Sequence, residues 1–310
     1  MKHILAINLG ATNIRGGVVS ENGNIKHIFQ RKLKTHAKKG LESYIFEFIE
    51  DIFTKAKKSN IKIEGIGVGS PGPIDLEEGI IKEMPNFPEI QNWNLKKDLK
   101  NEFKIPIEIE KDTSTSLIGE IWKGEAKNKK NAVLLTLGTG VGGAALVGRK
   151  ILRGSSGEAA EFGHITIDPK GKKCGCGKNG CLETFCGGRG IIKLAREKGM
   201  EAQNAKTVFD YARKGDGRAL EVLDKFKLAL KIGMGDLINI FNPELVIIGG
   251  KIALSSDLFL DELKKELNKY CFRSFTDDLE IKKSDLIDEA GLLGVSYLFF
   301  EPKFKFKNLS

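Results

Sequence analysis

Long apolar stretches are missing from this chain of 310 residues. No window approaches the roughly 18 apolar residues of a membrane helix, and the apolar run in MKHILAINLG is too short for a signal peptide. We therefore expect no membrane partner. The composition, with 41% hydrophobic and 29% charged residues, is typical of globular proteins, and the length suits two lobes.

Cysteine is also scarce, and its placement is uneven. The chain has five cysteines, an odd number, and three of them lie between residues 174 and 181. This pattern is unlike a disulfide framework. It favours reduced thiols in a cytoplasmic protein that holds a metal.

No block of basic residues accompanies the net charge of +9. The lysines are spread along the chain, which favours a solvated surface that also attracts anionic substrates. Nucleic-acid binding is the alternative, but no helix-turn-helix precedes the first strand and no RNA-binding module is visible. We expect no nucleic-acid partner.

A P-loop of the type G-x-x-x-x-G-K-[ST] is absent too, but two other glycine loops are present. TLGTGVGGAALV, near residue 140, echoes NLGATNIRGGVV near the start, and both predict a strand, a glycine turn and a second strand. The repetition suggests a duplicated fold. Helices are expected over 41–58, 94–103, 114–122, 188–198, 205–213, 217–240 and 257–270, and short strands over 244–250 and 279–282.

The second glycine loop matches G-x-G-x-x-G, a weak signal by itself. A dinucleotide site needs a helix directly after the glycines, and a strand is expected here instead. The loop is either a tight hairpin or a phosphate-binding loop whose backbone N–H groups approach phosphate oxygens. The candidate phosphate-binding residues are Gly138, Thr139, Gly140 and Gly142, with Gly10, Ala11 and Thr12 in the first loop.

Asp112 follows the predicted strand IPIEIEK and precedes a predicted helix. Ligands of open sheets meet such strand ends, and a carboxylate there can accept the proton of an alcohol that attacks a phosphoryl group. The alternative is a plain helix N-cap. Gly72 in GSPGPID and Asn86 in MPNFPEIQNW are, by themselves, equally compatible with turns.

The strongest signal is a group of four metal-binding side chains. His164 is followed by Cys174-x-Cys176-x-x-x-x-Cys181. Four nitrogen and sulfur ligands complete a tetrahedral structural zinc site and leave no open position for catalysis. Glu161 and Glu183 flank the group and remain available for other contacts.

These motifs together resemble the ROK family (repressors, open reading frames, kinases) of sugar kinases. The resemblance rests on LGATN, GSPGPID, PNFPEIQNW, the Asp112 segment, LGTGVGG, EFGH, CGCGKNGCLE and NPELVIIGG, and spans nearly the whole chain. It implies an α/β, two-lobed actin/hexokinase-like fold with a structural zinc loop over 164–181. We expect lobes at 1–113, completed by a C-terminal helix at 290–310, and at 114–289.

The resemblance also implies roles for individual residues. Asp112 would be the base, and the glycine loops would hold the phosphates of ATP with Mg²⁺, with Gly249 and Gly250 near the adenosine. The sugar would contact Gly72, Asn86, Asp112, Glu161, His164 and Glu183. His164 would serve sugar and zinc through its two ring nitrogens. Asn8 and Lys111 stand where the family usually has an acid and an asparagine, and Lys111 places a cation beside Asp112.

We therefore expect an ATP-dependent hexose kinase that phosphorylates glucose at its 6-hydroxyl. N-acetylmannosamine or N-acetylglucosamine is the alternative substrate, because Gly188-Arg189-Gly190 resembles kinases of those sugars. A sugar-binding sensor without catalysis is the alternative of another class. Family repressors carry an extra N-terminal DNA-binding segment, and this chain begins at its first strand, as the kinases do. Dimers are common in the family, so a homodimer or higher homo-oligomer is expected.

Overall fold

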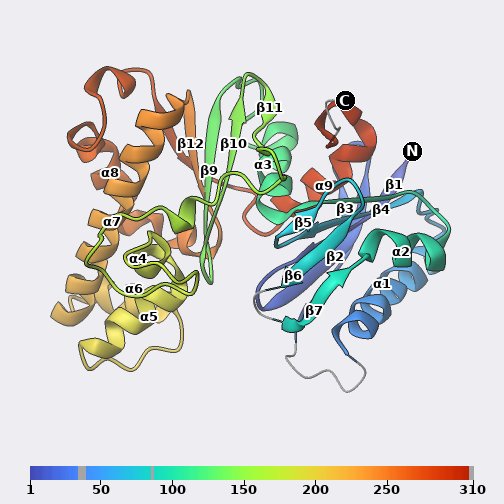
Figure 1. The fold of residues 1–310 in the computed structure, drawn as a ribbon, viewed down its shortest axis with the longest axis horizontal. Helices are drawn as coiled ribbons and strands as arrows, with labels where there is room; N and C mark the ends of the chain where they lie inside the picture. The colour runs from blue at the N-terminus through green and yellow to red at the C-terminus, as the bar shows by residue number, and fades with distance from the viewer. Residues whose placement is uncertain (34–39, 85–86, 307–310) are drawn as a thin grey trace. The chain divides into compact units, whose positions relative to one another are not determined.

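Two compact units make up the protein, whose computed structural model describes residues 1–33, 40–84 and 87–306 (Figure 1). Unit 1 comprises Met1–Lys127, Ile151–Ala159 and Glu289–Ser310. Unit 2 comprises Asn128–Lys150 and Ala160–Asp288. The division differs from the break expected after residue 113, because the helix that begins at Asp112 packs within unit 1.

Unit 1 is built on a five-stranded sheet in the order β3-β2-β1-β4-β8. Its strands are β1 (His3–Leu9), β2 (Asn13–Ser20), β3 (Ile25–Lys32), β4 (Gly65–Ser70) and β8 (Ile107–Lys111). The first three are antiparallel neighbours, joined by the expected glycine turn and by a turn at Asn22-Gly23, and β4 and β8 run parallel to β1. The carboxyl ends of β1, β4 and β8 therefore share one edge of the sheet.

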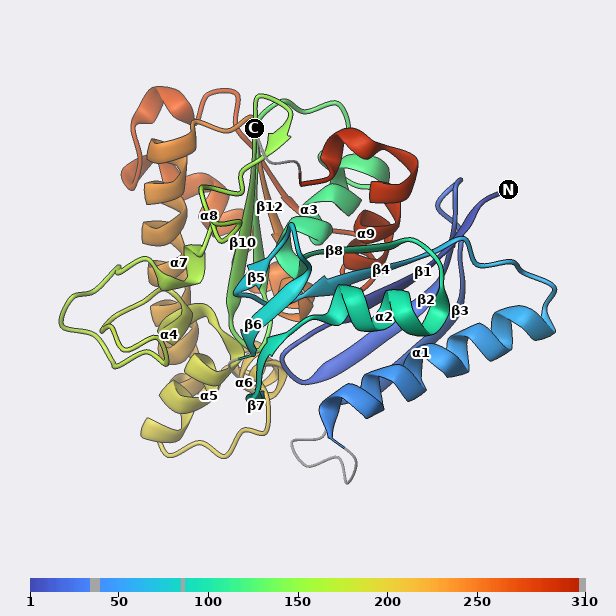
Figure 2. The same ribbon diagram turned by 45° about the vertical axis from the view of Figure 1, so that its right-hand side comes forward.

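Helices cover both faces of this sheet (Figure 2). Helix α1 (Leu41–Lys58) buries Ile45, Phe48 and Ile52 against β1, β2 and β3. Helix α9 (Ala290–Phe300) contacts β1, β2, β4 and β8 and packs on α3 (Asp112–Lys123). The helix expected over 290–310 ends at residue 300, since Pro302 disfavours a helical residue before it.

A second, three-stranded sheet extends unit 1. It contains β5 (Ile74–Asp75), β6 (Ile80–Met84) and β7 (Phe87–Trp93), and helix α2 (Leu95–Phe103) follows it. In β7 every third residue is buried rather than every second, which explains why no strand is evident in MPNFPEIQNW. Asn86 lies outside the described residues.

Unit 2 repeats the strand arrangement of unit 1. Its sheet runs β11-β10-β9-β12-β13, with β9 (Ala132–Leu137), β10 (Val141–Val147), β11 (Lys150–Ile151), β12 (Leu245–Gly249) and β13 (Glu280–Lys283). β9 and β10 form an antiparallel hairpin, and β12 and β13 run parallel to β9 and to one another. The repetition agrees with the duplicated fold that the glycine hairpins suggest, and the two-lobed α/β fold that the family resemblance implies is confirmed.

The helices of unit 2 follow the candidate metal loop, residues 164–181, in sequence. They are α4 (Glu183–Cys186), α5 (Gly188–Glu197), α6 (Ala205–Arg213), α7 (Gly217–Phe241) and α8 (Leu260–Glu266). α7 begins where the Asp216 side chain accepts hydrogen bonds from two backbone N–H groups and ends at Asn242, before Pro243. The single helix expected over 257–270 is wrong: the 3₁₀ helix Lys251–Leu258, α8 and the 3₁₀ turn Leu267–Lys269 share this region.

Candidate functional site

Asp112 lies at the carboxyl edge of the unit 1 sheet, as its position after a strand predicts. Asn8 pairs with Gly69 in register, and Ser70 pairs with Lys111, so the ends of three parallel strands meet beside Asp112. The first glycine hairpin leaves from this same edge, because it follows β1. The topology therefore brings the candidate base and the first candidate phosphate loop to one edge.

The Asp112 side chain belongs to the first turn of α3, and the N-cap position is Lys111. Asp112 Oδ1 accepts a hydrogen bond from the backbone N–H of Thr113 at 2.8 Å. The hydroxyls of Thr115 and Ser116 donate to the Asp112 carbonyl at 2.7 and 2.9 Å. The helix dipole favours a negative charge at this position. The N-cap residue is Lys111, so Asp112 is not the plain N-cap that the sequence left as an alternative.

The loop that contains Gly72 is held by an acid from a distant segment. Glu158 Oε1 accepts a hydrogen bond from the Ile74 N–H at 2.6 Å. A Cβ atom at residue 72 would lie 2.6 Å from Glu158 Oε2, so a larger residue there would require this carboxylate to shift. Sequence reasoning assigned no role to Glu158, because its partners are more than 80 positions away.

The first glycine hairpin is closed by backbone contacts. The Gly10 N–H donates to the Asn13 carbonyl at 2.8 Å, and the Leu33 N–H donates to the Thr12 carbonyl at 2.9 Å. Near this hairpin, Asn8 Oδ1 is a buried oxygen with no hydrogen-bond partner among the described residues. An oxygen in that condition fits a water or cation ligand better than a purely structural role.

The second glycine loop, Gly138 to Gly140, connects β9 to β10, so no helix follows it directly. A dinucleotide fingerprint is therefore absent, as expected. Gly188 N–H and Arg189 N–H donate to the carbonyls of Gly138 and Thr139, at 2.9 and 3.1 Å. The start of α5 thus holds the carbonyl side of the loop.

The other expected nucleotide-binding glycines lie nearby in the same sheet. Gly142 pairs across β9–β10 with Thr136, and Gly249 pairs with the same residue from β12. Gly250 follows at φ 79°, a conformation that favours glycine. Unit 2 therefore gathers all the nucleotide candidates of the second half of the chain around β9.

The turn Glu161–His164 packs on the strand that follows the glycine loop. Phe162 and Gly163 are buried, and a Cβ atom at residue 163 would lie only 2.0 Å from the Val141 carbonyl oxygen. Phe162 also packs on Phe241 of α7, with ring centroids 5.5 Å apart. Glycine in EFGH is required by this close approach.

Glu183 contacts the glycine loop directly. Its Oε2 accepts a hydrogen bond from the Val141 N–H at 2.9 Å, and a Cβ atom at residue 140 would lie 2.2 Å from that oxygen. Val141 therefore meets Glu183 through its N–H and Gly163 through its carbonyl. This connection between the two expected binding regions was not foreseen from the sequence.

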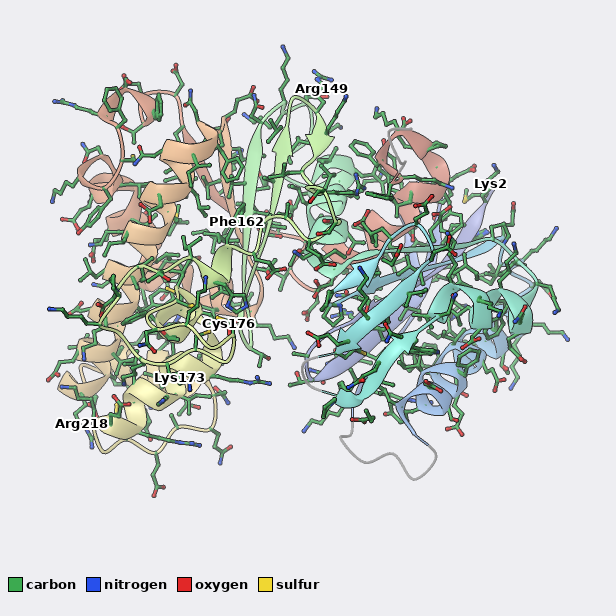
Figure 3. All side chains as sticks on the ribbon, viewed as in Figure 1. Lys2, Arg149, Phe162, Lys173, Cys176 and Arg218 are labelled. Atoms are coloured by element: carbon green, nitrogen blue, oxygen red, sulfur yellow. The ribbon has the colours of Figure 1, made fainter. Side chains whose placement is uncertain are left out.

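The four expected metal ligands lie together in unit 2, and Figure 3 labels Cys176 on the candidate metal loop and Phe162 on the neighbouring turn. The ligand atoms of His164, Cys174, Cys176 and Cys181 all lie within 4.8 Å of one another. Cys174 Sγ is 3.6 Å from His164 Nδ1, and Cys176 Sγ is 3.6 Å from Cys181 Sγ. Zn–N bonds of about 2.0 Å and Zn–S bonds of about 2.3 Å give tetrahedral edges of about 3.5–3.8 Å. The donor set fits Zn²⁺.

The thiols differ in their surroundings. Burial raises the pKa of Cys181 to about 12, whereas a hydrogen bond from the backbone N–H of Lys178 lowers the pKa of Cys176. A cation that binds here displaces protons from the buried thiols. Because His164 turns Nδ1 toward Cys174, its Nε2 remains for another contact.

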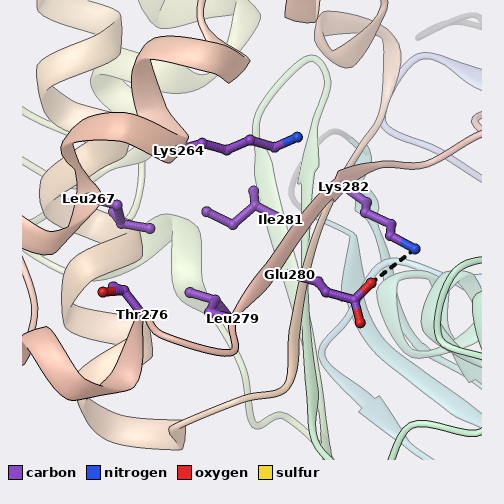
Figure 4. Close-up of a pocket in the computed structure, with 7 residues that line it drawn as sticks. All are labelled: Lys264, Leu267, Thr276, Leu279, Glu280, Ile281 and Lys282. Atoms are coloured by element: carbon purple, nitrogen blue, oxygen red, sulfur yellow. Dashed lines mark ion pairs between the residues drawn. The ribbon is translucent and has the colours of Figure 1, made fainter.

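The expected residues therefore fall into two groups. Gly72 and Asp112 belong to unit 1 with the first hairpin, and Glu161, His164 and Glu183 belong to unit 2 with the second loop. A pocket of about 370 Å³ in unit 2 contains none of them (Figure 4). It is lined by Lys264, Leu267, Thr276, Leu279, Glu280, Ile281 and Lys282.

Comparison with known proteins identifies the class. The ROK family matches residues 4–301, and the chain belongs to this family. It is 34% identical over 312 residues to a glucokinase of Thermotoga maritima, covering 96% of this chain and 97% of the relative. It is also 32% identical to a xylose repressor of Caldicellulosiruptor bescii, covering 94% of this chain and 76% of the repressor.

A solved relative confirms the fold. The ROK family glucokinase of Streptomyces griseus, in complex with glucose and AMPPNP, superposes with a TM-score of 0.83 at 27% identity, over 96% of this chain and 98% of the relative. Within the part of the chain that the structure describes, no helix is long and apolar enough to cross a membrane.

Proposed function

We propose that this protein is an ATP-dependent hexose kinase whose preferred substrate is glucose. The observation that carries the proposal is Asp112, a carboxylate in the first turn of α3 at the sheet edge from which the first glycine hairpin also leaves. The membership of the chain in the ROK family and its similarity to a glucokinase over nearly its whole length support the proposal that Asp112 is the base for phosphoryl transfer.

In the proposed reaction, Asp112 accepts the proton of the sugar 6-hydroxyl as O6 forms a bond to the γ-phosphorus of ATP. The bond from that phosphorus to the bridging oxygen breaks, and ADP leaves. Backbone N–H groups of the two glycine loops stabilise the charge on the phosphates. When bound, Mg²⁺ would neutralise phosphate charge, and Asn8 would help to hold it through its side-chain oxygen.

Unit 2 supplies the remaining sugar contacts in this proposal. Glu161, His164 and Glu183 would accept or donate hydrogen bonds to the sugar hydroxyls, with Gly72 and Asn86 contributing from the other half of the chain. A structural Zn²⁺ held by His164 and the three thiolates would keep the imidazole in place. The geometry that supports this is the turn of His164 Nδ1 toward Cys174.

Two alternatives follow from specific observations. Gly188-Arg189-Gly190 resembles a stretch of the N-acetylhexosamine kinases. In this chain, however, the N–H groups of Gly188 and Arg189 hold the glycine loop, and that contact is compatible with any sugar substrate. A sugar-binding sensor is favoured by the likeness to a xylose repressor and by Asn8, which lacks the charge of an acid. We further propose a homodimer or higher homo-oligomer, and a reducing cytoplasmic compartment that keeps the zinc thiols reduced.

The test measures ADP release with Mg-ATP against glucose, mannose, fructose and the N-acetylhexosamines. We expect the highest kcat/KM with glucose. Asp112→Asn should lower kcat by about 10²- to 10⁴-fold and leave glucose binding, measured by calorimetry, nearly unchanged. Asp277→Asn, at an exposed aspartate, is the control. If the protein binds sugar but turns over none of the sugars in the panel, the result would refute the kinase function and support a sugar-binding sensor.

A further inference from the structure

Residues 151–159, here named the strap, return from unit 2 to unit 1 before the chain enters the Glu161–His164 turn. Two acids hold the body of the strap. Arg153 donates to Glu110 Oε2 from Nε at 3.0 Å and from Nη2 at 2.7 Å, and Glu110 is 1% exposed. Glu158 accepts the Ile74 N–H. The strap is therefore fixed to β8 and to the Gly72 loop.

Lys111 holds the end of the strap. Its Nζ donates to the carbonyl oxygen of Ala159 at 3.0 Å, and the residue is only 6% exposed. Burial of an ammonium group is costly unless it is paired with acceptors. Lys111 lies at the carboxyl end of β8, next to Asp112. Its burial there therefore indicates that its contact with the strap has a functional role.

The residue after the clamped carbonyl has an unusual conformation. Ala160 has φ 67°, which residues with a Cβ atom seldom adopt. Its carbonyl then accepts the Phe162 N–H at 2.8 Å, which starts the turn that carries Glu161 and His164. The direction of the chain at this turn thus depends on a strained residue directly after the Lys111 contact.

We propose that Lys111 is a positioning residue for sugar binding: by holding the Ala159 carbonyl, it sets the place from which Glu161 and His164 meet the sugar. The inference rests on the proposed function, which assigns those two residues to the sugar. A different role for Lys111, purely electrostatic action on Asp112, predicts another result. Loss of a neighbouring cation raises the pKa of a carboxylate, so it would move the acidic limb of the kcat–pH profile to higher pH without changing sugar affinity.

The experiment compares Lys111→Met, Lys111→Gln and Lys111→Arg with Lys97→Met, a change at an exposed lysine of α2. We expect Lys111→Met to raise KM for glucose about tenfold or more, with KM for ATP and the kcat–pH profile unchanged. Lys111→Arg, which can donate to the same carbonyl, should recover most of the affinity. Lys111→Gln keeps a neutral donor and should lie between them, and it replaces Lys111→Met if that variant does not fold.

Amide hydrogen exchange gives a readout that does not depend on turnover. Peptides that cover residues 159–164 should exchange faster in Lys111→Met and Lys111→Gln than in the wild type and the Lys97→Met control. Unchanged exchange together with a glucose KM within about twofold of wild type, or a shifted kcat–pH profile alone, would overturn the inference. Absence of turnover in the wild type refutes the proposed function instead, and the exchange data with calorimetric sugar affinities then decide on Lys111.

Discussion

Replacement of Glu183 should weaken ATP binding, although the resemblance assigns this residue to the sugar. Its Oε2 is 2.9 Å from the Val141 N–H, and the Gly140 backbone packs against the same oxygen. Glu183→Ala removes this hydrogen-bond acceptor from the Val141 N–H, at the end of the glycine loop. Glu183→Gln keeps an oxygen at the same reach but removes the charge.

The magnitude follows from the kind of hydrogen bond. A bond to a charged acceptor contributes about 1.5–3 kcal/mol, and a neutral one about 1 kcal/mol. If the loop must recover its shape to bind phosphates, Glu183→Ala should lower ATP affinity by about 10- to 150-fold. Glu183→Gln should lose only the difference between the two kinds of bond, about 0.5–2 kcal/mol, or about 2- to 30-fold.

Calorimetric titration with a non-hydrolysable ATP analogue, without sugar, measures this effect apart from any sugar contact. Glu201→Ala, at an exposed glutamate of the same unit, is the control. The expected order of affinity is wild type, then Glu183→Gln, then Glu183→Ala. Nucleotide affinity within twofold of wild type in both variants, with only sugar affinity reduced, would refute the reasoning.

Three further predictions concern zinc, packing and the strap. Cys181→Ser should lower bound zinc, measured by elemental analysis, below one ion per chain and reduce sugar affinity; full zinc occupancy would contradict the four-ligand site. Gly163→Ala places a methyl group against the Val141 carbonyl and should lower the free energy of unfolding by about 1–3 kcal/mol; an unchanged free energy of unfolding in a denaturant titration would contradict this close packing. Arg153→Met leaves Glu110 buried without its cation and should cost about 3–5 kcal/mol in the same titration; a loss below about 1 kcal/mol would indicate a solvated pair.

Most of the fold could be predicted from local sequence patterns. The glycine hairpins, the parallel strands and the long helix α7 each leave a signal within a few residues, because periodicity and turn chemistry act over short distances. β7 left no such signal, since its buried positions repeat every third residue. The region around α8 has a helical sequence pattern, but non-helical backbone at Phe259 and the short length of α8 divide the helix expected over 257–270.

The group of candidate metal ligands could be predicted for the same reason, because its four members lie within one short segment. The partners of Lys111 and Glu158 could not be predicted, since Lys111 finds its acceptor 48 positions away and Glu158 its donor 84 positions away. A lysine before the candidate base suggests an electrostatic effect on that base when only the sequence is known. The positioning role proposed for Lys111 depends on its contact with the Ala159 carbonyl of the strap, which only the tertiary structure shows.

The assignment of α9 to unit 1 has a consequence for how the chain acquires its structure. α9 meets α3 backbone to backbone, since a Cβ atom at residue 294 would lie 1.6 Å from the Thr115 carbonyl oxygen, and it covers β1 and β4. During synthesis, the chain up to Phe300 must leave the ribosome before α9 can cover that apolar face of the sheet. The segments of unit 2 all precede α9 in the chain. The unit whose first strands are translated first is therefore the unit that is completed last.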